Sequence, residues 1–232
     1  MRSFTIPGLD IEFYQHDTSQ PVSEDAYYLY LKSKLSLERF NSPFPIPHFP
    51  LTSILDLGTG NGILLLMLAK DFRNLCFTGI EIVKELCDIA IQNFNKLCAY
   101  LKENVHFQII NADYSELGNT LNKKYDMILS NPPYYPNGTG RLSSDFIKAV
   151  AKFELSATLG QLLQSIKDYL TPNGKSFVVF PYLRANEFEE NCRRSDLKIN
   201  SYDFIDYKRQ SFHRDIKNVN HKTKIIYELT HA

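Results

Sequence analysis

Four consecutive residues, Asn131, Pro132, Pro133 and Tyr134, form the motif with the most specific chemistry in this sequence. Two successive prolines fix the backbone and have no N–H group, so the carbonyls of Asn131 and Pro132 have no neighbouring donor. The Asn131 side-chain oxygen and the Pro132 carbonyl can therefore accept both N–H groups of a planar amine. Tyr134 offers a flat face on which a base can stack. The alternative is a rigid loop with an incidental aromatic residue.

A glycine-rich turn, residues 56–62 with the sequence DLGTGNG, follows a short apolar run. Its GxGxG spacing differs from the GxGxxG of dinucleotide-binding folds and from the GxxxxGK[ST] of phosphate loops. Gly58 and Gly60 allow the backbone to pass close to a ligand. The carboxylate of Asp56, just before the turn, can reach a ligand's amino group but would repel a pyrophosphate. The alternative is a tight strand-to-helix turn without a ligand.

Two further acids, Glu81 and Asp113, follow the next two predicted strands. Glu81 can accept two hydrogen bonds from ribose hydroxyls, and Asp113 can accept one from an adenine amino group. Each acid alone is equally explained as a solvent-facing residue at a strand end. Together with Asp56 they place three acidic groups along one edge of a sheet, where ligands lie across the carboxyl ends of parallel strands.

The elements that would position these residues are visible as alternating apolar patterns. Strands are predicted over residues 53–57, 75–81, 105–110, 125–130 and 175–180, and helices over 23–35, 63–70, 83–101, 143–170 and 185–194, with a turn at 171–174. Two last strands, 198–207 and 222–229, have no helix between them and are expected to add as antiparallel edge strands. The predicted fold is α/β and Rossmann-like: a doubly wound, mostly parallel seven-stranded sheet with an antiparallel C-terminal hairpin.

Composition narrows the class of protein further. The 232 residues suit one domain, which we expect to span residues 51–232, with residues 1–50 as an N-terminal extension that forms part of a cofactor or substrate lid. Lys+Arg and Asp+Glu number 26 each, which neither favours nor excludes a nucleic-acid partner. No signal peptide or membrane span is visible, so a cytoplasmic location is expected. No histidine or cysteine spacing predicts a metal site, and the sequence leaves the oligomeric state open.

Four stretches, ILDLGTGNGILLLMLA, GIEIVKELCDIAIQNF, YDMILSNPPYY and KAVAKFELSATLGQLL, carry a resemblance to a known family. The chain resembles the class I S-adenosylmethionine-dependent methyltransferases from about residue 51 to residue 180. Within that class it looks like the bacterial tRNA adenine-N6 methyltransferases that modify position 37 of a valine tRNA. The resemblance implies S-adenosyl-L-methionine as the cofactor and the exocyclic N6 amine of an adenine in tRNA as the target.

The resemblance also implies roles for individual residues. The cofactor would be bound by Asp56, Gly58, Thr59, Gly60, Glu81, Ile82, Asp113, Tyr114 and Asn131. Of these, Glu81 would take the ribose, Ile82 would pack on the adenine and Asp113 would take its amine. The target base would be held by the loop from Asn131 to Tyr134. The longer segment that covers the cofactor in this family has only a short counterpart here, residues 22–26.

Three other functions use similar motifs. An N5-glutamine methyltransferase of protein release factors and a guanine-N2 methyltransferase of ribosomal RNA hold their targets in the same kind of loop, and a nucleoside-binding module without enzymatic activity keeps only the sheet. Basic residues bracket the loop in sequence (Lys123, Lys124, Arg141, Lys148 and Lys152) or crowd the tail, where Tyr202, Phe204, Tyr207 and Phe212 interleave with them. They fit an RNA-binding surface and a solvated edge hairpin equally well.

Overall fold

The structure is a computed structural model that describes residues 1–17, 23–40, 53–118, 121–135, 157–208, 210–214, 220 and 222–232. Its strands are β1 (Arg2–Thr5), β2 (Glu12–Gln15), β3 (Ser53–Leu57), β4 (Cys76–Glu81), β5 (His106–Asn111), β6 (Tyr125–Ser130), β7 (Leu170–Pro181), β8 (Leu197–Asp206), β9 (Ser211–His213) and β10 (Lys224–His231). Its helices are α1 (Glu24–Phe40), α2 (Ile63–Asp71), α3 (Lys84–Leu101), α5 (Leu159–Tyr169) and α6 (Ala185–Arg194), with short 3₁₀ turns η1 (Tyr114–Glu116) and η3 (Tyr182–Arg184).

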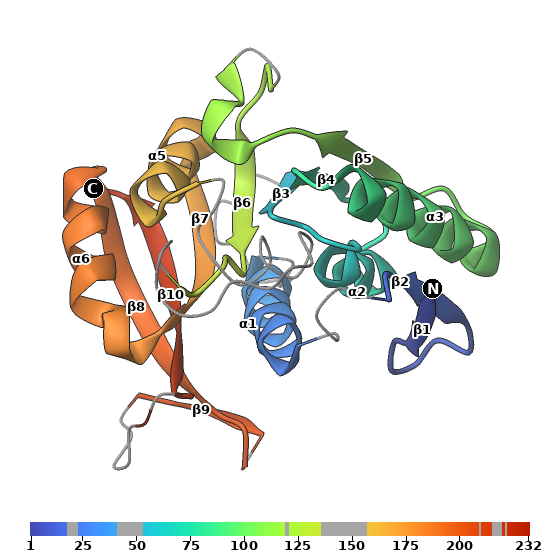
Figure 1. Ribbon diagram of the computed structural model, residues 1–232, viewed down its shortest axis with the longest axis horizontal. Helices are drawn as coiled ribbons and strands as arrows, with labels where there is room; N and C mark the ends of the chain where they lie inside the picture. The colour runs from blue at the N-terminus through green and yellow to red at the C-terminus, as the bar shows by residue number, and fades with distance from the viewer. Residues whose placement is uncertain are drawn as a thin grey trace.

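The main sheet has eight strands in the order β5-β4-β3-β6-β7-β10-β8-β9 (Figure 1). The first five strands in this order, β5, β4, β3, β6 and β7, run parallel to one another. The chain lays down β3, β4 and β5 in one direction and then returns to add β6 and β7 on the other side of β3. The carboxyl ends of β3 and β6 therefore flank the point where the strand order reverses, which is where such sheets bind ligands. The predicted doubly wound, Rossmann-like fold is confirmed.

The predicted antiparallel pairing of the last two long strands, β8 and β10, is confirmed, but their order in the sheet differs from the expectation. β10 inserts between β7 and β8 and runs antiparallel to both, so β8 is parallel to β7. The reason is the helix α6, which supplies a crossover long enough to return the chain in the same direction. The three-residue strand β9, which adds an eighth strand to the seven predicted, forms the edge beside β8.

Helices cover both faces of the sheet, with α1, α2 and α3 on one and α5 and α6 on the other (Figure 1). Alternate residues of the central strands supply the two cores. Ile54 and Met127 face the first layer, and Leu55 and Ile128 face the second, as the two-residue period of a strand requires. No helix within the described ranges has an apolar stretch long enough to cross a membrane.

Three local features differ from the sequence prediction. The turn expected at residues 171–174 lies within β7 as an irregularity in its pairing with β6. Of the helix predicted over 143–170, α5 confirms the part from Leu159 to Tyr169, Ala157 and Thr158 are not helical, and residues 143–156 lie outside the described residues. The N-terminal β1–β2 hairpin was not predicted; its Tyr14 backbone exchanges two hydrogen bonds with the buried Asn93 side chain of α3, at 2.7 and 2.9 Å.

Helix α1 begins where the sequence predicts. The Ser23 hydroxyl accepts a hydrogen bond from the Ala26 N–H at 3.2 Å, which caps the first turn. The helix then packs against α2, where the Tyr30 hydroxyl and the Lys34 ammonium each donate to Asp71 at 2.6 Å. These contacts make α1 part of the first helical layer.

Candidate active site

The glycine turn after β3 is shaped by three residues with positive φ: Gly58 at 81°, Gly60 at 57° and Gly62 at 82°. The N–H groups of Gly58 and Thr59 both donate to the carbonyl of Ile80 at 2.9 Å, and that of Gly60 donates to Glu81 at 2.8 Å. These three N–H groups therefore donate within the protein and do not form a phosphate cradle. This agrees with the GxGxG spacing, which differs from that of phosphate loops. A Cβ on Gly60 would meet nothing within 4 Å, so the turn is open on that side.

Asp56 is buried in β3, with 2% of its surface exposed. Burial raises the pKa of Asp56 from 3.8 to about 7; the nearby Thr59 hydroxyl opposes this rise, and the charge of Glu81 adds to it. The Thr59 hydroxyl oxygen is itself buried and has no hydrogen bond of good geometry within the described chain. A buried carboxylate beside an unpaired hydroxyl is a site prepared for a ligand that brings positive charge.

Glu81 ends β4 and is also buried, with 7% of its surface exposed. Its two carboxylate oxygens accept from the N–H groups of Gly60 at 2.8 Å and Val83 at 2.9 Å. Burial raises the pKa of Glu81, and these N–H groups oppose that rise. Each oxygen retains a lone pair, so the carboxylate can still accept from two hydroxyls. The neighbouring Ile82 is 36% exposed and offers an apolar surface at the mouth of the site.

Asp113 lies at the next strand end, beyond β5. One of its carboxylate oxygens caps η1 by accepting from the Ser115 N–H at 2.8 Å and its hydroxyl at 2.7 Å. The ring of Tyr114, which follows, lies 4.0 Å from the position of a Cβ built on Gly58. Tyr114 also lines a small pocket with Pro132, Pro133, Ala157, Thr158, Leu159, Leu162 and Phe180. Tyr114 thus links the glycine turn to the proline loop.

The loop Asn131–Tyr134 follows β6 on the same sheet edge as the glycine turn, where the Ser130 hydroxyl donates to the Leu57 carbonyl at 2.8 Å. The orientation of its polar groups differs from the expectation. The Asn131 side-chain oxygen already accepts a hydrogen bond from the Tyr134 hydroxyl. That hydroxyl also contacts Asp25 of α1, at 2.8 Å. The Lys224 ammonium lies 3.8 Å from the centroid of the Tyr134 ring, so one face of the ring is covered.

Sequence reasoning missed three residues that hold this site together. The Asn111 amide donates to the carbonyls of Glu81 and Ile82 at 2.9 and 2.8 Å, which joins the ends of β5 and β4. Asn93 donates to the Asn61 carbonyl in the glycine turn at 3.0 Å. At Gly79 in β4, a Cβ would lie 2.7 Å from the side chain of Thr59. An asparagine at a strand end and a glycine inside a strand were the available signals.

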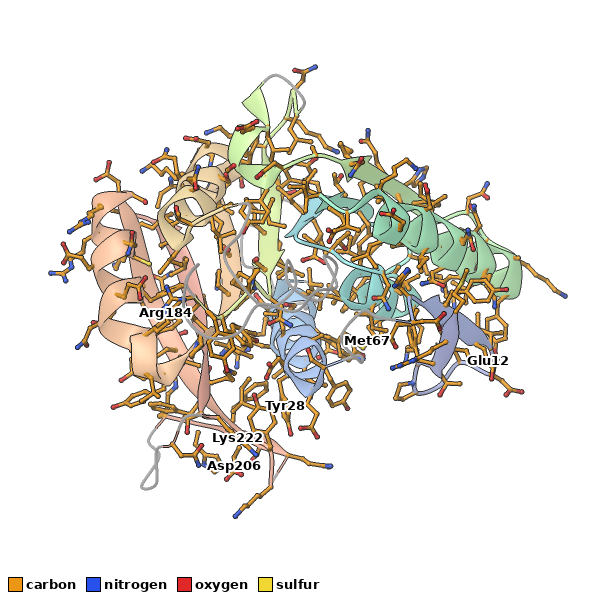
Figure 2. The ribbon with its side chains drawn as sticks, in the orientation of Figure 1. Glu12, Tyr28, Met67, Arg184, Asp206 and Lys222 are labelled. Atoms are coloured by element: carbon orange, nitrogen blue, oxygen red, sulfur yellow. The ribbon has the colours of Figure 1, made fainter. Side chains whose placement is uncertain are left out.

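The basic and aromatic residues proposed for RNA contact are dispersed. Lys123 and Lys124 precede β6 and lie at its amino end, opposite the Asn131 loop. Arg141, Lys148 and Lys152 lie outside the described residues. In the C-terminal hairpin, Phe204 is buried, and Tyr207 and Phe212 pack edge-on against Tyr28 of α1, with centroids 5.5 and 5.8 Å apart (Figure 2 labels Tyr28). Tyr202 remains exposed.

The sheet order and the glycine turn at its switch point define a Rossmann-like methyltransferase fold. Solved structures agree: the chain superposes on a methyltransferase from Pyrococcus furiosus with a TM-score of 0.57 at 19% identity, covering 94% of this chain and 87% of that one. It also superposes on an S-adenosylmethionine-dependent methyltransferase from Agrobacterium tumefaciens with a TM-score of 0.60 at 14% identity, covering 99% and 69%. At these identities the likeness shows the fold.

The family described as "Methyltransferase domain" matches residues 48–227, and the chain belongs to it. Curated relatives carry the name tRNA1(Val) (adenine(37)-N6)-methyltransferase. One from Photorhabdus laumondii is 30% identical over 77% of this chain and 72% of its own length. One from Shewanella woodyi is 28% identical over 97% and 86%, and one from Aliivibrio salmonicida is 27% identical over 61% and 57%. The match thus spans little more than half the length of some relatives.

Family membership supports the expected cofactor, S-adenosylmethionine, and the site fits it. The methionine part carries an ammonium group, and the buried Asp56 carboxylate beside the Thr59 hydroxyl suits that charge. The ribose carries two hydroxyls, and the Glu81 carboxylate has the two remaining acceptor sites for them. The open side of the turn at Gly60 leaves space for a ligand to pass close to the backbone.

Proposed function

We propose that the protein is an S-adenosylmethionine-dependent methyltransferase that methylates the exocyclic N6 amine of an adenine in tRNA. The observation that carries the proposal is the position of the Asn131–Tyr134 loop. It follows β6, directly beside the β3 turn that contains Gly58 and Gly60, on one sheet edge. The names of the curated relatives support the choice of tRNA and of adenine. A cytoplasmic location would follow from such a substrate.

The cofactor, when bound, supplies an electrophilic methyl group on a sulfonium. The chain's own residues then have two tasks. Asp56 and Glu81 hold the cofactor, as described above. The Asn131 side-chain oxygen and the Pro132 carbonyl accept the two N–H groups of the target amine, which favours a pyramidal nitrogen and stabilises the positive charge that grows there during transfer. Holding the amine in line with the methyl group supplies much of the remaining rate enhancement.

The experiment is labelled methyl transfer to total tRNA that lacks modifications, followed by nuclease digestion. We expect labelled N6-methyladenosine. A release factor and ribosomal RNA are assayed in parallel as the competing substrates. Labelled N5-methylglutamine with unlabelled tRNA, or labelled N2-methylguanosine, would contradict the tRNA adenine assignment. Loss of the label with Asn131→Ala would show that the transfer depends on the loop rather than on a contaminating enzyme.

A further inference from the structure

The N-terminal helix α1 reaches the proposed target-amine site through the side chain of Asp25. One Asp25 oxygen accepts from the Tyr134 hydroxyl at 2.8 Å, and the other accepts from the Tyr207 hydroxyl of the segment after β8. Ser23, at the cap of the same helix, accepts from the Asn131 amide at 3.3 Å. Asp25 of α1 and the capping residue Ser23 thus contact the side chains of Tyr134 and Asn131 in the proposed target site.

The position of Asp25 is fixed by contacts along α1. Tyr28, one turn further on, packs edge-on against Tyr207 and Phe212, and Figure 2 shows it on the side of the helix that faces the C-terminal strands. Lys32, one turn beyond Tyr28, is partly buried and forms an ion pair with the buried Asp203 of β8. These tertiary contacts therefore hold Asp25 in place, whereas an exposed side chain would move freely.

The Tyr134 hydroxyl has a single proton and two acceptors within reach, the Asp25 carboxylate and the Asn131 amide oxygen. Burial raises the pKa of Tyr134 well above its usual range, and the negative charge of Asp25 raises it further, so the hydroxyl stays protonated. The proton can be donated to only one acceptor at a time. A hydrogen bond to a carboxylate is stronger than one to a neutral amide oxygen.

This competition changes how well Asn131 can act on a substrate. When Tyr134 donates to Asn131, that bond uses one of the two lone pairs of the amide oxygen and leaves a weaker acceptor for the target amine. When Tyr134 donates to Asp25, both lone pairs of the Asn131 oxygen are available to the amine. Resting on the function proposed above, we infer that Asp25 is a positioning residue, which draws the Tyr134 hydroxyl away from Asn131 and keeps its oxygen available to the target N–H.

The test is a double-mutant cycle between Asp25 and Tyr134 in the full chain. Asp25→Asn keeps the shape but removes the charge, and we expect kcat to fall about tenfold, the difference between a charge-assisted and a neutral hydrogen bond. The Kd for S-adenosylhomocysteine should stay unchanged, because Asp25 acts on the target side. In a Tyr134→Phe background the competing hydroxyl is absent, so adding Asp25→Asn should change kcat by less than about twofold.

Tyr207→Phe is the matched control, because it removes the other hydrogen bond to Asp25 without touching Tyr134. The effects of Tyr207→Phe and Tyr134→Phe on kcat should be additive in the double variant. Additivity would show that the contact that anchors α1 acts independently of the contact that releases Asn131. Two results would overturn the inference. One is full activity of Asp25→Asn, and the other is the same tenfold loss from Asp25→Asn in the wild type and in the Tyr134→Phe background. The cycle is measured on whichever amine or amide the wild type methylates, so a wrong substrate assignment shows separately, in the identity of the wild-type product.

Discussion

The buried carboxylate of Asp56 should make the protein without cofactor less stable as the pH rises. In the folded state its pKa is about 7, against 3.8 when unperturbed, because burial disfavours the charge. The folded pKa lies above the unfolded one, so this group stabilises the fold fully below about pH 4, and the contribution is lost as the pH rises through about 7. Between pH 5 and pH 8 the loss amounts to about 3 kcal/mol.

Asp56→Asn removes this titration while keeping the shape of the side chain. We expect the free energy of unfolding of the variant, relative to wild type, to increase by about 3 kcal/mol between pH 5 and pH 8. Urea unfolding of cofactor-free protein at both pH values measures it. Asp10→Asn is the matched control, because it removes an equal formal charge at an exposed position. Asp56→Asn should also bind S-adenosylmethionine more weakly, since the ammonium group of the cofactor loses its counter-charge.

The same pH dependence of stability in Asp56→Asn and Asp10→Asn would contradict a raised pKa of the buried Asp56. Cofactor binding by Asp56→Asn as tight as that of the wild type at pH 8 would contradict the role of Asp56 as a counter-charge. In the wild type, affinity for the cofactor should rise as the pH rises through about 7, since the positively charged ligand prefers the ionised form of Asp56.

Three further variants test separate parts of the structure. Asn131→Ala should nearly abolish methyl transfer while calorimetry shows that the cofactor still binds; a near-normal rate would contradict the proposed role of the loop. Gly79→Ala places a Cβ 2.7 Å from the Thr59 side chain, so thermal unfolding should show a loss of about 1–3 kcal/mol, with weaker cofactor binding in calorimetry. Lys32→Met leaves the buried Asp203 paired with Arg214 within the described residues, and urea unfolding should show a loss of about 2 kcal/mol, below the ~3–5 kcal/mol of a fully orphaned charge. An unchanged midpoint for either stability variant would contradict the packing described here.

The parallel strands of the sheet, and the residues that follow their carboxyl ends, could be predicted from the sequence alone. Apolar runs such as residues 53–57 and 125–130 are buried on both faces, so their period and length specify parallel strands. The glycine turn and the acids Glu81 and Asp113 follow such strands directly. Because parallel strands end at one edge, position along the chain was enough to place these residues near one another.

The contacts of the side chains in the Asn131–Tyr134 loop depend on the tertiary structure. Tyr134 and Asp25 are 109 residues apart in sequence and form a hydrogen bond, and no local pattern specifies such a pairing. The same holds for β10, whose place between β7 and β8 is set by the connection through α6 and by the cores it completes. The aromatic residues of the hairpin looked like a stacking surface, but Tyr207 and Phe212 pack against α1 instead. Local propensity and spacing fix elements and their ends, whereas contacts between distant segments depend on which faces can be buried together.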